Sequence, residues 1–153
     1  MMTSFKIDWV LNNELAIGRA PIKISHFEYL KKNNIKAILN LCDQKEAPIF
    51  DEVEKYFNFK RFVLPDHKVN KEILISEINE ILSIIESLRK SGPIYVHCYA
   101  GIERSPIVCM SWLVAKHKLS PQRALDYLME VHPGTNPLPS QFKLLNNIDQ
   151  TMF

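Results

Sequence analysis

The chain has 153 residues, of which 46% are hydrophobic and 24% charged, and its formal net charge is +2. This length fits one compact domain that buries most of its apolar surface, and the composition is that of an ordinary globular protein rather than a disordered, collagenous or membrane one. Lysines alternate with acidic residues instead of forming a basic block, so the charge pattern gives no reason to expect a nucleic-acid partner.

No apolar stretch is long enough to cross a membrane, and the first residues lack the charged and apolar regions of a signal peptide. We therefore expect a cytoplasmic protein, with a monomer as the default. The three cysteines, Cys42, Cys98 and Cys109, suit neither a secreted disulfide framework nor a zinc site. A free cysteine is ordinarily a small buried hydrophobe, and this is the interpretation that we adopt for Cys109.

Short strands alternate with helices in the first half of the chain. Ser25, with Glu28 three residues later, predicts the start of a helix that Asn33 and Asn34 end. A polar loop follows the predicted strand over 37–42, and Pro65, which cannot donate a backbone hydrogen bond, ends the predicted strand over 59–64. The predicted elements are strands within 7–10 and 15–17, a helix after residue 25, a buried strand over 37–42, a helix around 50–57 and a strand over 59–64.

Helices dominate the second half. Apolar residues with a 3.6-residue period predict a helix over 71–90, and an apolar segment from residue 104 predicts a central buried helix. Ser120 and Pro121 begin another helix, and a last one is expected from Ser140 to near the C-terminus. A short strand is predicted over 93–98, between the helix over 71–90 and the helix from residue 104. We therefore predict a single α/β domain over 1–153, with a central, mainly parallel sheet flanked by helices on both faces.

The stretch His97-Cys98-Tyr99-Ala100-Gly101-Ile102-Glu103-Arg104-Ser105 carries the functional signal. A cysteine at a strand end is followed by a five-residue loop and by an arginine that enters a helix. The loop N–H groups and the positive end of the helix dipole together form a cradle for a phosphate-sized anion, and a glycine allows the tight turn. This order of elements predicts an anion-binding loop.

Three side chains of this stretch suit phosphoryl transfer. The thiolate of Cys98 is favoured near a helix N-terminus and an arginine, and a thiolate is a competent nucleophile. The planar fork of Arg104 can bind two phosphate oxygens, which lysine does less well. The Ser105 hydroxyl is placed to hydrogen-bond the sulfur.

This motif resembles the signature of the protein tyrosine phosphatase superfamily, and the chain is similar to its small dual-specificity branch over roughly residues 7–150. The resemblance implies the cysteine-phosphatase fold and a phosphocysteine intermediate, with no metal or cofactor. It implies a phosphorylated protein substrate, namely phosphotyrosine with or without phosphoserine and phosphothreonine. The loop residues Tyr99 to Arg104 would bind the phosphate.

In that family an aspartic acid on a mobile loop protonates the departing oxygen. Asp66 matches by position, since it lies 32 residues before Cys98 and just after a predicted strand. Without Cys98, an ordinary turn residue would be the better interpretation of this aspartate. Asp43 and Asp51 are weaker candidates because their spacing is less suitable.

Further roles follow from the same resemblance. Asn136 and Gln141 occupy a stretch in which the family supports the phosphate loop or the hydrolytic water, although Asn136 equally suits a turn. His97 resembles the histidine that supports the loop and the thiolate, a role close to that of a satisfied core histidine. Cys42 ends a neighbouring predicted strand, and a reversible disulfide with oxidised Cys98 is a hypothesis.

The loop departs from the family pattern at Glu103 and Pro106. Because Glu103 is acidic and the loop has no lysine, a highly phosphorylated inositol lipid is a poorer substrate than phosphotyrosine. Three alternatives stay open: a lipid or RNA 5′-phosphatase of the same superfamily, a catalytically silent phosphoprotein-binding module, and a coincidental motif in a structural protein.

Overall fold

A five-stranded sheet runs through the part of the chain that the computed structural model describes, residues 4–51 and 53–153. The strand order is β1-β2-β5-β3-β4, and all neighbours are parallel except the antiparallel pair β1 and β2. This confirms the predicted mainly parallel sheet. The strands are β1 (Asp8–Leu11), β2 (Leu15–Gly18), β3 (Ala37–Asn40), β4 (Asn58–Arg61) and β5 (Ile94–His97).

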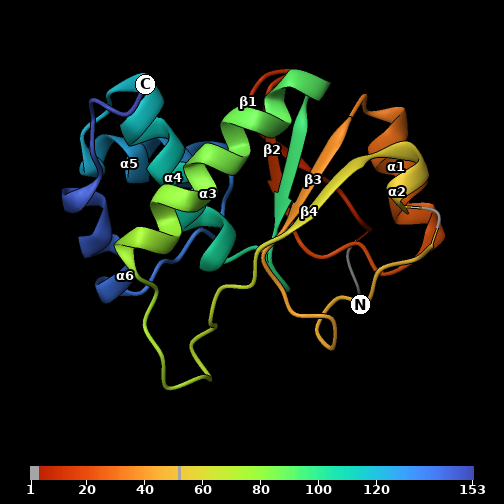
Figure 1. The fold of residues 1–153 in the computed structure, drawn as a ribbon, viewed down its shortest axis with the longest axis horizontal. Coiled ribbons are helices and arrows are strands. Elements are labelled where there is room, and N and C mark those ends of the chain that lie inside the picture. The colour runs from red at the N-terminus through yellow and green to blue at the C-terminus, as the bar shows by residue number, and fades with distance from the viewer. Residues whose placement is uncertain (1–3, 52) are drawn as a thin grey trace.

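Helices cover both faces of this sheet, as predicted. Figure 1 shows α1 and α2 on one side, and the long helices α3 and α4 with α5 and α6 on the other. The helices are α1 (Ile24–Lys32), α2 (Val53–Tyr56), α3 (Ile75–Leu88), α4 (Arg104–His117), α5 (Pro121–Val131) and α6 (Pro139–Leu144), with short 3-10 turns over Arg89–Ser91 and Leu145–Asn147.

Two apolar cores lie on the two faces because side chains alternate along each strand. In β5, Ile94 and Val96 join the larger core beneath α3, α4 and α5, while Tyr95 joins the smaller core beneath α1 and α2. In β3, Leu39 joins the larger core and Ile38 joins the smaller one. Every residue of β3 and β5 is buried, which is the reason that these strands read as short continuous apolar runs.

Several predicted helix boundaries are wrong. Ser25 does not cap α1: the helix starts at Ile24, its N-cap Lys23 makes no side-chain hydrogen bond, and the His26 ring accepts the N–H of Ile22 instead. The predicted helix over 50–57 is observed only as α2, and residue 52 lies outside the described residues. The helix expected over 71–90 begins only at Ile75.

The ends of two further elements also differ from expectation. β4 ends at Arg61, although the chain after it still hydrogen-bonds to the end of β3 and to the next residue, with Phe62 N–H donating to Asn40 O and Leu64 N–H to Leu41 O. The strand therefore ends before Pro65, and Asp66 lies on a long connection rather than directly after the strand. The last helix starts at Pro139 and gives way to a 3-10 turn after Leu144, well before the C-terminus.

None of the helices in the described residues is both long and apolar enough to cross a membrane.

His97 gives the fold a pH dependence that can be measured. Burial lowers its pKa to about 4, with Arg61 and Arg104 adding to the effect and a hydrogen bond to the Cys98 carbonyl opposing it. The unfolded chain takes up a proton below about pH 6.5 and the folded chain does not. We therefore expect the free energy of unfolding to fall as the pH drops from about 6.5 to 4, by up to about 1.4 kcal/mol per pH unit.

Urea unfolding between pH 4 and 7.5 measures this contribution. The His97→Gln variant keeps a side chain that can hydrogen-bond but removes the titrating ring, so its stability should vary less over the same range. Equal pH dependence in both proteins would contradict the prediction.

Candidate active site

The loop over residues 98–103 joins the end of β5 to the start of α4. β5 is parallel to both its neighbours. Its carboxyl end therefore lies at the same end of the sheet as the carboxyl ends of β2 and β3, where the connections after those strands begin. The N–H of Ala20 donates to Tyr99 O at 3.0 Å and fixes the loop to the segment after β2. The sheet therefore sets the position of the loop.

Gly101 is required by this loop for two reasons. Its φ is +75°, a left-handed conformation that favours glycine. A Cβ atom at this position would also lie 2.8 Å from the backbone C and O of Gly18. Backbone conformation and space therefore exclude a side chain together.

Cys98 is buried, with 2% of its surface exposed, and its sulfur faces donors of the loop. The Gly101 N–H donates to Sγ at 3.3 Å, and the Ser105 hydroxyl lies 3.2 Å from Sγ. The structure thus brings Cys98 and Ser105 together. This arrangement places a backbone N–H group and a hydroxyl against the sulfur.

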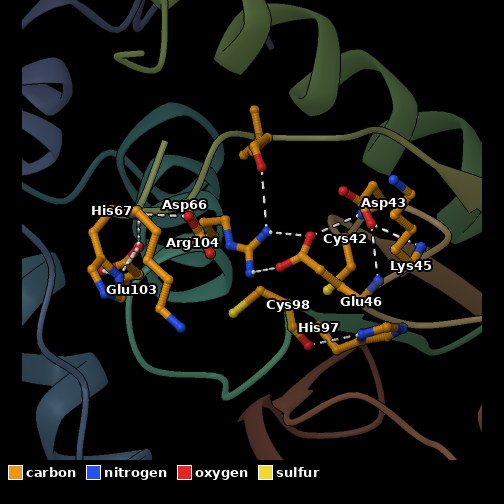
Figure 2. Close-up of polar contacts among 12 residues, drawn as sticks. Cys42, Asp43, Lys45, Glu46, Asp66, His67, His97, Cys98, Glu103 and Arg104 are labelled. Atoms are coloured by element: carbon orange, nitrogen blue, oxygen red, sulfur yellow. Dashed lines mark hydrogen bonds and ion pairs between the residues drawn. The ribbon is translucent and has the colours of Figure 1, made fainter. Parts of the chain in front are cut away.

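Arg104, the first residue of α4, is only 3% exposed. Its guanidinium makes a two-point ion pair with Glu46, Nη2–Oε1 at 2.8 Å and Nη1–Oε2 at 3.2 Å, and Nη1 also donates to Leu64 O at 3.3 Å (Figure 2). Burial acts to lower the pKa of Arg104, but the Glu46 hydrogen bonds and the neighbouring sulfurs outweigh it and the net pKa is raised. Nε is buried and has no hydrogen-bond partner among the described residues.

Glu46 is a residue of the site that the sequence did not predict. It lies on the connection after β3, held by a turn in which Asp43 Oδ1 accepts the Lys45 and Glu46 N–H groups and Asp43 N–H donates to Glu46 Oε2. The sequence did carry one sign of this role. Glu46 is an acidic residue shortly after β3, and β3 lies beside β5 in the sheet, so the segments after both strands leave the sheet close together. Asp43, considered as a weaker acid candidate, instead shapes this turn.

Asp66, His67 and Lys68 line the same open cavity of about 590 Å³ as Cys98 and Arg104. Asp66 is half-buried, and its Oδ1 accepts the Lys68 N–H at 2.8 Å. Asp51 does not line this cavity. The structure therefore brings the predicted acid and nucleophile to one site.

Glu103 links the two loops of the site. Its carboxylate accepts the His67 N–H at 3.0 Å and lies 3.3 Å from His67 Nδ1. Only 14% of the Glu103 side chain is exposed, compared with 57% for His67. Glu103 was predicted as a member of the phosphate-binding loop whose charge repels further phosphates, and its carboxylate also tethers the loop of Asp66 to the loop over 98–103.

The two C-terminal candidates do not line the cavity that contains Cys98. Asn136 is exposed, and its backbone N–H donates to Ile102 O at 2.9 Å. Gln141 is buried, and its Oε1 accepts the Leu138 N–H and caps α6. It lines a smaller cavity beside Asp66 and His67 rather than the one that contains Cys98. In the described residues, no cluster of three His, Cys, Asp or Glu side chains is placed to hold a metal ion.

A family model described as "Dual specificity phosphatase, catalytic domain" matches residues 20–151. The chain belongs to this family. The mouse "Dual specificity protein phosphatase 2" is 31% identical over 108 residues, which is 69% of this chain and 32% of that protein. The chain thus spans less than a third of the length of the first curated relatives that it matches.

Solved structures share the fold. A structure described as "Tk-PTP in the active form" has a TM-score of 0.82 and 24% identity, covering 96% of this chain and 97% of that one. The structure of PTPMT1 in complex with PI(5)P also has a TM-score of 0.82, with 16% identity and coverage of 95% and 96%. These likenesses establish the cysteine-phosphatase fold that the sequence predicted.

Replacing Glu46 tests the ion pair. Glu46→Ala leaves the buried Arg104 charge without its carboxylate, so we expect the free energy of unfolding to fall by about 1–3 kcal/mol. Misplacement of the guanidinium should also lower kcat/KM for p-nitrophenyl phosphate by about 10²-fold. Glu46→Gln keeps the shape of the side chain and should lose less on both measures.

Glu54→Ala, at an exposed position on α2, is the matched control and should behave like the wild type. Wild-type stability and turnover in Glu46→Ala would show that the pair has no role.

Proposed function

We propose that the chain is a cysteine-dependent phosphatase that hydrolyses phosphotyrosine in proteins, with or without phosphoserine and phosphothreonine. The supporting observation is that a buried cysteine, a buried arginine fork and a half-buried aspartate line one cavity at the end of β5. We propose further that it acts as a monomer in the cytoplasm, on phosphorylated proteins rather than nucleic acid or membrane.

In the first step, the Cys98 thiolate attacks phosphorus and a P–S bond forms as the P–O ester bond breaks. Asp66 gives its proton to the departing oxygen. In the second step, water attacks phosphorus and the P–S bond breaks, while Asp66 takes a proton from the water. The Ser105 hydroxyl, 3.2 Å from Sγ, stabilises the leaving thiolate.

Arg104 supplies positive charge to the phosphoryl group in both steps. Glu46 occupies the Nη1 and Nη2 side of its fork, which leaves Nε and the second Nη2 hydrogen for two phosphate oxygens. The loop N–H groups and the start of α4 act on the same oxygens. Glu46 thus orients the fork without competing for its phosphate-binding side.

The walls of the cavity favour an aromatic phosphoester. Tyr99 and Ile102 are 59% and 46% exposed at its rim and offer apolar surface to a ring. Glu103 places a carboxylate in the wall of a cavity that Lys68 also lines, and this carboxylate disfavours a ligand with further phosphates. These features support phosphotyrosine over an inositol lipid.

A phosphoinositide is the second candidate substrate, and the likeness to PTPMT1 in complex with PI(5)P is the observation that favours it. That likeness, at 16% identity, extends to the fold alone. An RNA 5′-phosphatase remains a further alternative of the same chemistry. The silent binding module explains less, because binding alone does not need an aspartate in the same cavity as the cysteine.

Turnover of p-nitrophenyl phosphate and a phosphotyrosine peptide, with a chelator present, tests the mechanism. We expect activity in the wild type, none in Cys98→Ser, and a loss of about 10²–10⁴-fold in Asp66→Asn. The Asp66 loss should be larger with the peptide, because nitrophenolate departs readily without a proton. Asp51→Asn is the control and should retain full activity.

A panel of phosphoserine peptide, PI(5)P vesicles and 5′-triphosphorylated RNA separates the alternatives. A higher kcat/KM for lipid or RNA than for the phosphotyrosine peptide would replace the proposed substrate. Phosphopeptide binding by the wild type without any turnover would indicate the binding module.

We also propose that Cys42 protects oxidised Cys98. Peroxide converts the Cys98 thiolate to a sulfenic acid, and attack by the Cys42 sulfur then forms a disulfide and releases water. Cys42 is buried on the connection after β3, beside Arg104 and Glu46 (Figure 2). Burial raises its pKa to about 12, with Arg104 partly opposing, so this disulfide should form slowly.

After brief peroxide treatment and reduction with dithiothreitol, Cys42→Ser should recover several-fold less activity than the wild type. Cys109→Ser, which removes another buried thiol, is the control and should recover like the wild type. Equal recovery in all three proteins would exclude the disulfide.

A further inference from the structure

Two carbonyl groups of the loop over 98–103, here called the phosphate loop, have hydrogen-bond partners in the segment after α5. One of these partners is a buried side chain that the mechanism does not use. His132 follows α5 and is 8% exposed. Its Nε2 lies 2.7 Å from Gly101 O, and its Nδ1 lies 2.6 Å from Asp8 Oδ2 on β1. The ring therefore bridges an edge strand and the centre of the loop.

Both partners of the His132 ring are acceptors. A carbonyl and a carboxylate cannot donate, and a neutral imidazole has only one N–H, whereas an imidazolium donates at both nitrogens. The 2.6 Å contact to Asp8 is as short as a charge-assisted hydrogen bond. Asp8 thus orients the ring so that Nε2–H meets the Gly101 carbonyl.

The direction of a carbonyl determines the direction of the next N–H, because the peptide unit is planar and trans. With Gly101 O drawn toward His132, the trans peptide unit turns the N–H of Ile102 to the opposite side of the loop, and Ile102 lines the cavity together with Cys98. The Asn136 N–H acts in the same way on Ile102 O and directs the Glu103 N–H. Outward carbonyls and inward N–H groups are the condition for an anion cradle.

We propose that His132, oriented by Asp8, is a positioning residue that holds the phosphate loop in its anion-binding shape. The inference rests on the proposed function only in taking the loop as the phosphoryl site. Of the two contacts that hold these adjacent carbonyls, His132 is the one made by a side chain, so substitution can remove it. Its loss should weaken every ligand of the cradle, whatever group carries the phosphate.

Calorimetric titration with inorganic tungstate measures the cradle without requiring catalysis. We expect His132→Ala to raise the tungstate Kd by about tenfold or more, the equivalent of one lost hydrogen bond to the loop. Asp8→Asn should give a smaller increase, since it removes the charge that orients the ring. His132→Arg, which has donors for both acceptors, should restore part of the affinity.

His117→Ala, at the exposed end of α4, is the matched control and should bind tungstate like the wild type. Circular dichroism and the thermal midpoint give the folded fraction of each variant, and affinities are compared per folded molecule. Asp8→Asn keeps an isosteric side chain at a partly exposed position, so it serves if His132→Ala does not fold.

Unchanged tungstate affinity per folded molecule in Asp8→Asn and in any folded His132 variant would overturn the inference, as would a wild type that binds no tungstate. Turnover of the phosphotyrosine peptide is measured in parallel and tests the proposed function separately. A wild type that binds tungstate but hydrolyses nothing, with weaker binding in the variants, would refute the phosphatase and support the positioning role.

Discussion

The burial of Arg104 is the constraint on which the rest of the site depends. A guanidinium at the start of an almost wholly buried helix must have acceptors, because an unpaired charge in such a place is very costly. Glu46 and the Leu64 carbonyl provide them, so the connections after β3 and β4 are both drawn to the end of β5. The position of Asp66, two residues beyond Leu64, follows from the same packing.

The phosphate loop is fixed by neighbours on several sides. Ala20 holds it at Tyr99, His132 and Asn136 hold it from behind, and Glu103 joins it to the loop of Asp66. These contacts come from the segments after β2, after β4 and after α5. A rigid cradle of this kind has its donors in place before a ligand arrives, which is the physical basis of electrostatic preorganisation.

Local patterns in the sequence predicted what is local in the structure. The sheet, its two covered faces and the loop from Cys98 to Ser105 depend on consecutive residues or on short periods, and the structure has them. The Ser25 cap was wrong because the helix starts before it, at Ile24, with the His26 N–H donating to Lys23 O. The extent of β4 was overestimated because the strand ends at Arg61, although Phe62 and Leu64 still hydrogen-bond to Asn40 and Leu41.

Contacts between distant residues could not be predicted in this way. Glu46 and Arg104 are 58 residues apart, and His132 and Asp8 are 124 apart. Neither pair has a spacing that marks it, since each depends on how two connections leave the sheet. The sequence did indicate a neighbouring segment, because Asn136 and Gln141 were expected to support the loop, but it gave no sign of His132.

The N-terminal hairpin belongs to the catalytic unit even though the family match begins at residue 20. β2 pairs with β5, Gly18 lies against Gly101, and Asp8 holds His132, so all three contacts arise from residues before that match. A fragment cut at residue 20 would expose β5 as a hydrophobic edge strand, an invitation to aggregation. The boundary of sequence similarity is therefore not the boundary of the folding unit.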